Sequence, residues 1–326
     1  KMKKILLFLI VTISFVAHCQ QSMVDSLKIE LDQKKTNNDK LVVLEKLNSI
    51  LISDSNLVKS LPYFTEMSKL AQKENLYKIE TKAYRYMCEA NMKKGDSLES
   101  YRVAVKALNI SDLKNDLEDY LLVINQYGRA FHRFQNYKEA VKTYNLGIKK
   151  YNDEGDGMPI AVLSNIYSNL SVAYDKMGLG NESINALLGA LDISEKTNNI
   201  KGKAHTLYLV GYKYMALEQN NKAEKYFLNS LDYAETNLLT VYKYMNHHGL
   251  GLNYSRMEKY DKALEHNKIA LEYFRKKGNK LYEFDVLNNS ATVFLKMKKN
   301  EEALDYSSKA LKIAKDLNHQ LAINGS

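Results

Sequence analysis

Small side chains return at a fixed interval along almost the whole of this 326-residue chain, in three columns that share one register. The first column advances in steps of 40, 40, 43, 40, 40 and 40 residues through Ser60, Ser100, Ala140, Ser183, Ala223, Ala263 and Ala303. The second lies seven residues later, at Met67, Ala107, Gly147, Ala190, Ser230, Ala270 and Ala310. The third lies twelve residues before the first, at Asn48, Cys88, Gly128, Ser171, Gly211, Gly251 and Ala291. Three coupled columns predict one structural unit copied about seven times.

The columns have a physical explanation if the unit is a pair of antiparallel helices. Two packed helices approach closely only where Gly, Ala, Ser or Cys leaves room, and large side chains must fill the space beside each narrow point. Three residues after the third column the chain places mostly aromatic residues, among them Phe131, Tyr174 and Tyr254. Bulk from the second helix comes from Tyr144, Leu187 and Phe227. We therefore predict an all-α fold in which helical hairpins stack and bury a continuous core.

The residues expected at the turns keep the same register. Fifteen residues after the first column come Asn75, Asn115, Gly155, Asn198, Leu238, Gly278 and Asn318. Asn and Gly tolerate the left-handed backbone conformation that ends many helices. We therefore expect every repeat to end at this column, the seventh at Asn318, with the three extra residues inserted just after Gly155.

These patterns resemble the tetratricopeptide repeat family, whose unit of about 34 residues carries a small residue, an aromatic residue and two alanine-like positions at the same relative offsets. One matching set is Tyr127, Gly128, Phe131, Ala140, Tyr144 and Gly147. The resemblance implies an α-α superhelix, a right-handed solenoid of about seven hairpins, over residues 38–318. The period of 40 and the missing opening Trp and closing Pro depart from the family pattern.

The first 19 residues have the features of a secretory signal peptide. Lys3 and Lys4 precede a short apolar run over residues 5–11, and small Ala17 lies two residues before Cys19. The run is too short for a membrane span. We expect cleavage after Cys19 and delivery to the periplasm or cell envelope. The alternative is a lipoprotein in which Cys19 is acylated.

Both ends of the repeat array carry expectations of their own. Residues 20–37 are expected to form a capping helix that uses Val24, Leu27, Ile29 and Leu31 as its apolar contacts. Residues 319–326 read as the start of an incomplete eighth repeat, which would leave the face around Leu304, Leu311 and Ile313 exposed. We therefore expect a longer protein of which this is the front part, or a clipped chain. Contact with a membrane is expected only through a lipidated Cys19 or a missing downstream segment.

Catalytic and metal-binding patterns are not evident. Removal of the signal peptide leaves Cys88 as the single cysteine, so no internal disulfide is possible, and its small-residue column predicts a buried, inert thiol. The seven histidines show no metal-ligand spacing. The net charge of +9, of which Lys1, Lys3 and Lys4 contribute three, is spread along the chain without a concentrated basic run. We expect no enzyme activity, no cofactor or metal, and no binding to nucleic acid.

Binding is the function that remains. In the resembled family the first helix of each repeat lines a concave groove that holds a protein or an extended peptide. The family's groove positions fall in this sequence on Lys82, Arg85, Asn125, Arg129, His132, Asn165, Ser168, His205, Tyr208, Tyr212, His248 and Asn288. The resemblance implies a ligand-sensing region of a bacterial signalling protein. The alternative is a stand-alone scaffold for an envelope complex, and a kinase or DNA-binding module further along the gene would favour the sensor.

Overall fold

The computed structural model describes residues 22–52, 57–155 and 161–324, with side chains described as far as Leu317. The predicted signal peptide and the insertion after Gly155 therefore lie outside the described residues. Within the described ranges every regular element is a helix and none is a strand, which confirms the predicted all-α fold.

The helices alternate between first and second members of hairpins. A helix over residues 22–33 comes first. It is followed by α2 (Asn37–Ile52), the short 3₁₀ helix η1 (Leu57–Ser60), α3 (Leu61–Lys73), α4 (Tyr77–Lys94), α5 (Ser97–Leu113), α6 (Leu117–Arg133), α7 (Tyr137–Glu154) and α8 (Val162–Lys176). The remainder are α9 (Gly180–Lys196), α10 (Ile200–Ala216), α11 (Asn220–Thr236), α12 (Thr240–Arg256), α13 (Tyr260–Lys277), α14 (Lys280–Lys296) and α15 (Asn300–Asn324).

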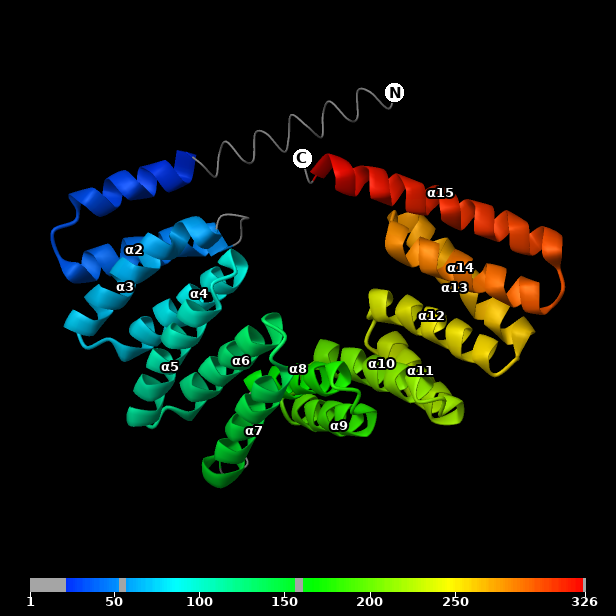
Figure 1. The fold of residues 1–326 in the computed structure, drawn as a ribbon, viewed down its shortest axis with the longest axis horizontal. Helices are drawn as coiled ribbons and strands as arrows, with labels where there is room; N and C mark the ends of the chain where they lie inside the picture. Colours follow the sequence, from blue (N-terminus) through cyan, green and yellow to red (C-terminus); the bar gives the residue numbers. More distant parts are fainter. Residues whose placement is uncertain (1–21, 53–56, 156–160, 325–326) are drawn as a thin grey trace. The chain divides into compact units, whose positions relative to one another are not determined.

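The helix starts reproduce the interval seen in the sequence. Second helices begin at Ser97, Tyr137, Gly180, Asn220, Tyr260 and Asn300. Within the units, α5, α7, α11, α13 and α15 each pack beside the first helix before them in the chain (Figure 1). The chain divides into two compact units, Lys1–Ala173 and Tyr174–Ser326, with the boundary inside α8. We call them unit 1 and unit 2 and describe each by itself.

All three small-residue columns are buried along their whole length, as the sequence predicts. The reason is clearest at two glycines of the third column. A Cβ atom at Gly128 would lie 2.5 Å from Cζ of Tyr144, and one at Gly211 would lie 2.8 Å from Cδ1 of Phe227. In each hairpin the aromatic ring of the second helix thus occupies the space that a side chain on the first helix would need.

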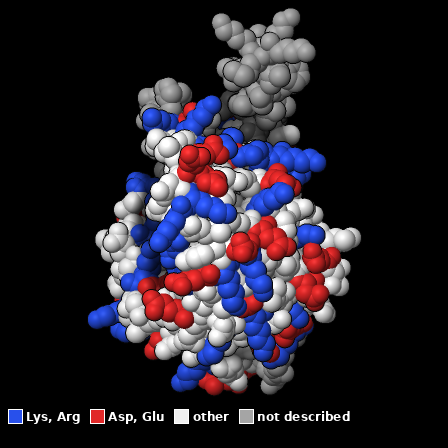
Figure 2. All heavy atoms as spheres, turned by 90° about the vertical axis from the view of Figure 1, so that its right-hand side faces the viewer, with Lys and Arg blue, Asp and Glu red and all other residues white. Residues whose placement is uncertain are grey.

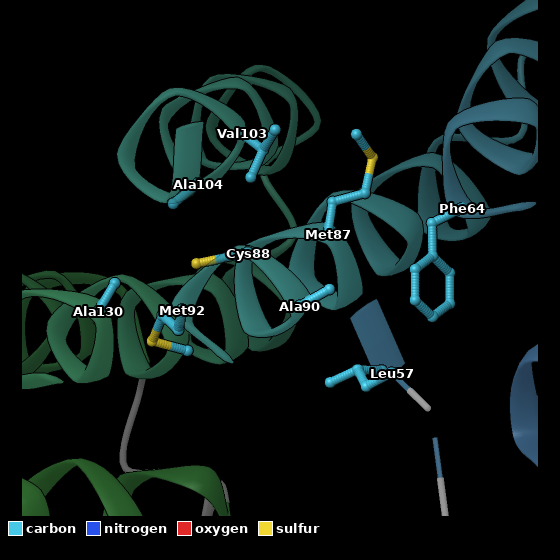
Figure 3. Close-up of a cluster of buried hydrophobic side chains, with 9 residues drawn as sticks. All are labelled: Leu57, Phe64, Met87, Cys88, Ala90, Met92, Val103, Ala104 and Ala130. Carbon is cyan, nitrogen blue, oxygen red and sulfur yellow. The ribbon is translucent and has the colours of Figure 1, made fainter. Parts of the chain in front are cut away.

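The core of unit 1 includes Cys88, whose sulfur lies among Met92, Ala104 and Ala130 (Figure 3). Cys88 is fully buried, and desolvation raises the pKa of its thiol to about 12. A thiol that stays protonated near neutral pH is a poor nucleophile, so Cys88 acts as a small packing residue.

The helix over residues 22–33 packs on the first hairpin. Val24 is buried against Leu47 and Leu51, and Leu31 is buried in the cluster that contains Leu41. Leu27 is half-buried beside both clusters. Ile29, in contrast, is 60% exposed, so it contributes less to this contact than we expected from the sequence.

Turns between repeats adopt the predicted left-handed conformation at Asn75, Asn115, Asn198 and Gly278, and Leu238, which does not suit it, adopts it as well. At these five residues φ lies between 50° and 69°. The exception is Gly155, which ends α7 with φ −81° and so makes no use of its conformational freedom. A second left-handed column, inside the hairpins, escaped sequence reasoning and comprises Gly95, Gln135, Gly178, Glu218, Glu258 and Lys298. The six hairpins from α4–α5 to α14–α15 therefore each close through one left-handed residue whatever its side chain.

The end of the seventh repeat differs from the prediction. Asn318 does not end a helix, because α15 continues through it to Asn324. An asparagine inside a helix costs about 0.5 kcal/mol relative to alanine, which is too little to end the helix. Leu304 and Leu311 are exposed as expected, but Ile313 is buried in the cluster with Ala310 and Leu271.

Leu238 is a branched side chain in a conformation that suits asparagine or glycine. Its φ is 55° and its side chain is 87% exposed, so it gains little from packing. Leu238→Asn should raise the free energy of unfolding by about 0.5–1 kcal/mol, because the left-handed conformation costs a non-glycine residue roughly that much or more. Urea unfolding monitored by circular dichroism measures the change. Asn198→Leu, at φ 50°, is the matched reverse substitution and should lower stability; equal stabilities for both variants would contradict the explanation.

No helix among the described residues is both long and apolar enough to cross a lipid bilayer. Basic and acidic side chains are interspersed over the face shown in Figure 2, without an extended area of one sign.

Candidate functional site

Side chains on successive first helices contact one another, and these contacts define what we call the first-helix face of each unit. In unit 1, Lys82 Nζ of α4 lies 2.8 Å from Glu45 Oε1 of α2. Arg129 Nη1 of α6 lies 3.0 Å from Glu89 Oε2 of α4. On the next pair, Asn169 Nδ2 of α8 donates to Asn125 Oδ1 of α6 over 2.9 Å. In unit 2 the same relation joins Lys213 of α10 to Asp175 of α8.

All twelve groove residues predicted from the sequence lie on first helices, but two of the predicted cations are less available than expected. Lys82 and Arg129 are neutralised by the carboxylates just described. Arg85 approaches Asp119 only to 3.9 Å, and its Nε is buried without a hydrogen-bond partner among the described residues. The face of unit 1 is therefore a network of paired charges and amides.

The other predicted residues of unit 1 vary in exposure. Asn165 is exposed, and Asn125 and Ser168 are half-buried. Ser168 Oγ donates to the carbonyl of Ser164 within its own helix. The ring of His132 packs edge-on against Tyr137, with centroids 5.2 Å apart. These residues share the first-helix face, but the contacts do not gather them around one point.

One point on this face is hollow. A cavity of about 380 Å³ lies where α4, α6, α7 and α8 meet. Its lining residues are Glu89, Met92, Lys93, Arg129, His132, Arg133, Tyr144, Asn169 and Val172. We call it the α4–α8 cavity. It combines charged, amide, hydroxyl and apolar groups, a mixture typical of ligand sites.

Tyr144 enters this cavity from the second helix α7. Its side chain has no exposed surface, and its hydroxyl has no hydrogen-bond partner among the described residues. Burial raises the pKa of Tyr144, and the positive charge of Arg129 opposes that shift. The absence of a side chain at Gly128 is what allows the ring to reach this position. The hydroxyl is therefore a neutral donor awaiting an acceptor.

Sequence reasoning missed Lys93, Arg133 and Tyr144 as members of this site. Lys93 and Arg133 are 40 residues apart, at the same position of two successive repeats, and Arg133 directly follows the predicted groove residue His132. That shared column could have revealed them. Tyr144 was assigned only to the core.

In unit 2 the predicted aromatic residues form a packed cluster. The rings of Tyr208 and Tyr212 lie 4.9 Å apart, and Phe227 lies edge-on to Tyr212 at 5.4 Å. Desolvation raises the pKa of Tyr208, and it raises that of Tyr212 to about 12. Tyr208 is only 6% exposed. The sequence placed Tyr208 on the ligand-facing surface, and the structure places it in the core.

His248 is a second correction of the same kind. Its ring is 3% exposed and stands perpendicular to that of Tyr282, with centroids 5.8 Å apart. Neither ring nitrogen has a hydrogen-bond partner among the described residues. Because Tyr282 of the next first helix covers it, His248 cannot contact a ligand on this surface.

The two remaining predicted residues of unit 2, His205 and Asn288, are exposed. His205 lies beside Tyr242, with ring centroids 6.0 Å apart. It also lines a largely apolar cavity of about 490 Å³ formed by Lys201, His205, Leu238, Leu239, Thr240, Val241, Tyr242 and Met245.

Burial lowers the pKa of His248 to about 4, which makes unit 2 sensitive to acid. The unfolded chain binds a proton at His248 near pH 6.5 and the folded chain does not, so stability falls as the pH drops from about 6.5 towards 4. The loss from this residue should be on the order of 3 kcal/mol. His248→Phe keeps a ring there and should weaken the acid sensitivity. Urea unfolding at pH 7.5 and pH 4.5 tests this, and an unchanged difference between the two pH values would contradict it.

Among the described residues no group of three or more His, Cys, Asp and Glu side chains is placed to hold a metal ion. His247 and His266 lie side by side, and their Nδ1 atoms are 2.9 Å apart and share a hydrogen bond.

Comparison with known proteins agrees with the helical hairpins. A tetratricopeptide repeat family model matches residues 244–316, which span α12 to α15. No curated protein matches the sequence.

Solved structures extend the tetratricopeptide repeat fold over most of the chain. A signal transduction ATPase with numerous domains that has a tetratricopeptide repeat sensor, from Pyrococcus horikoshii, matches with a TM-score of 0.63 and 15% identity over 91% of this chain. The match spans 46% of that larger protein. The apo quorum sensor NprR from B. thuringiensis matches with a TM-score of 0.62 and 17% identity, covering 90% of this chain and 81% of NprR.

A third similar structure is a Rap protein complexed with Competence and Sporulation Factor. Its TM-score is 0.52 and its identity 13%, covering 91% of this chain and 80% of that protein. At these identities the three structures establish the shared fold of tetratricopeptide repeat hairpins.

Proposed function

We propose that this chain is a non-catalytic module that binds a protein or an extended peptide along the first-helix face of unit 1. The observation that carries the proposal is the α4–α8 cavity, because its lining residues Glu89, Arg129 and Asn169 also form the contacts that define that face. A ligand lying along the face would therefore pass over a recess with hydrogen-bond donors and apolar walls. Amide and guanidinium groups are suited to peptide carbonyls and carboxylates.

The similar structures support a sensing role. NprR is a quorum sensor, and the Rap protein is complexed with a factor, both with the fold found here. We extend that role to this chain and propose that it is the ligand-sensing region of an exported bacterial signalling protein. The basic and apolar pattern of residues 1–19 supports export to the periplasm or cell envelope.

Binding can be tested with peptides selected from a phage-displayed random library against the full chain. The double variant Asn125→Ala, Asn169→Ala removes both partners of one hydrogen bond and should leave the fold intact. It should weaken the selected peptides by about 10-fold or more. The control is Asn109→Ala, Asn152→Ala, which changes exposed asparagines on the second helices α5 and α7.

Hydrogen exchange locates the bound peptide. Protection of α4, α6 and α8 is the expected result. Protection confined to α5 and α7, or equal binding by the two double variants, would contradict the proposed face.

Export is tested by expressing the full chain in a bacterium and sequencing the N-terminus of the fractionated protein. A periplasmic protein that begins at Gln20 supports the proposal, and an acylated Cys19 supports the lipoprotein alternative. Cytoplasmic protein that retains residues 1–19 would contradict export.

A further inference from the structure

The charges that line the α4–α8 cavity do not balance. Glu89 is the one carboxylate in the lining, and it already accepts hydrogen bonds from Gln126 Nε2 at 2.6 Å and from Arg129. Lys93 and Arg133 form no ion pair with any described residue. Two positive charges therefore line the cavity without compensation.

A neutral donor completes the polar part of the lining. The Tyr144 hydroxyl is buried without a partner, and a buried donor left unsatisfied is costly. An acceptor oxygen that reaches the hydroxyl from the cavity would remove that cost. Lys93 from α4, Arg133 from α6 and Tyr144 from α7 thus supply donors from three helices to one recess.

The remaining lining residues are apolar and suit an organic group. Met92 and Val172 line the cavity, and its volume of about 380 Å³ exceeds what a bare oxyanion fills. The preferred occupant therefore carries an anionic head joined to an organic group.

We propose that the α4–α8 cavity binds a phosphate monoester, with Lys93, Arg133 and Tyr144 donating to the phosphoryl oxygens and Met92 and Val172 contacting the attached carbon group. A phosphate monoester carries nearly two negative charges at pH 7 and three acceptor oxygens, which matches two uncompensated cations and one hydroxyl. A carboxylate would neutralise only one of the cations. This inference rests on the proposed binding function and names the ligand chemistry of its site.

Phenyl phosphate and benzoate are the first probes, because they share a ring and differ in the charge of the head group. Isothermal titration calorimetry on the full chain should show phenyl phosphate binding about 10-fold or more tightly than benzoate. Arg133→Gln and Lys93→Gln should each weaken phenyl phosphate by about 10-fold. Tyr144→Phe, which removes only the hydroxyl oxygen, should weaken it by about 5-fold while leaving the unfolding temperature unchanged or higher.

Lys149→Gln is the matched control, since Lys149 is exposed on α7 and is not among the lining residues. It makes the same charge change and should leave phenyl phosphate binding unaltered. Equal affinity for phenyl phosphate and benzoate, no binding of phenyl phosphate, or equal losses in Lys149→Gln and Arg133→Gln would each overturn the proposal.

A second comparison identifies the source of the phosphoryl group. A hexapeptide containing phosphoserine that binds about 10-fold more tightly than free phosphoserine indicates a phosphorylated protein, and equal affinities indicate a small monoester. If selected peptides protect α4 and α6 in hydrogen exchange while phenyl phosphate fails to bind, this proposal fails and the proposed function stands.

Discussion

Replacing Phe227 with alanine should cost unit 2 about 3–5 kcal/mol of unfolding free energy, the largest effect we expect from a single truncation. Phe227 is fully buried, and its ring lies against two glycines on consecutive first helices. A Cβ atom at Gly211 would lie 2.8 Å from Cδ1, and one at Gly249 would lie 2.6 Å from Cε1. The ring therefore fills the junction of α10, α11 and α12, and its removal leaves a cavity that these helices cannot close without moving.

Urea unfolding followed by circular dichroism measures this loss. Phe294→Ala is the matched control, because Phe294 is only half-buried and contacts Tyr306 with ring centroids 5.1 Å apart. It should cost clearly less than Phe227→Ala. Similar losses for the two variants would contradict the assignment of Phe227 to the junction.

Gly128→Leu should destabilise unit 1 by about 3 kcal/mol, because the new side chain would overlap the ring of Tyr144. The ring cannot move aside easily, since Tyr144 has no exposed surface. The same variant should also disturb ligand binding, because Tyr144 lines the α4–α8 cavity.

Asn165→Leu is the control for Gly128→Leu. It introduces the same side chain at an exposed position of a first helix and should change stability by no more than about 0.5 kcal/mol. A loss of stability as large as that of Gly128→Leu would show that a leucine on a first helix is destabilising in itself, and that overlap with Tyr144 is not the cause.

The repeat unit could be predicted from the sequence because close packing of two helices requires small residues at the same positions of every repeat. Gly128, Ala140 and Gly147 are small for one reason, the approach of two backbones, and that reason recurs in every hairpin. The left-handed residues inside the hairpins do not share a residue type, so no pattern in the sequence marks them. Gln135, Glu218 and Lys298 are ordinary helix residues, and their conformation is imposed by closure of the turn.

The candidate site was predicted less completely, because exposure depends on neighbouring helices. His248 and Tyr208 occupy groove offsets, but Tyr282 and the packed tyrosines bury them. Tyr144 showed the opposite difference, since it was assigned only to the core and is also among the residues that line a cavity. The position of a residue along one helix determines the direction in which its side chain points. The adjacent hairpin determines whether that side chain is exposed or buried.

The most direct test of the account is a double-mutant cycle of Gly128→Ala, Tyr144→Ala and the double variant, measured by urea unfolding. We expect the alanine at position 128 to cost about 1–3 kcal/mol beside the tyrosine ring. Once that ring is gone it should stabilise by up to about 1 kcal/mol, because alanine favours the helix over glycine. The double variant should then be at least as stable as Tyr144→Ala alone. Losses that simply add would contradict the claim that small residues on first helices exist to admit the large side chains of the second.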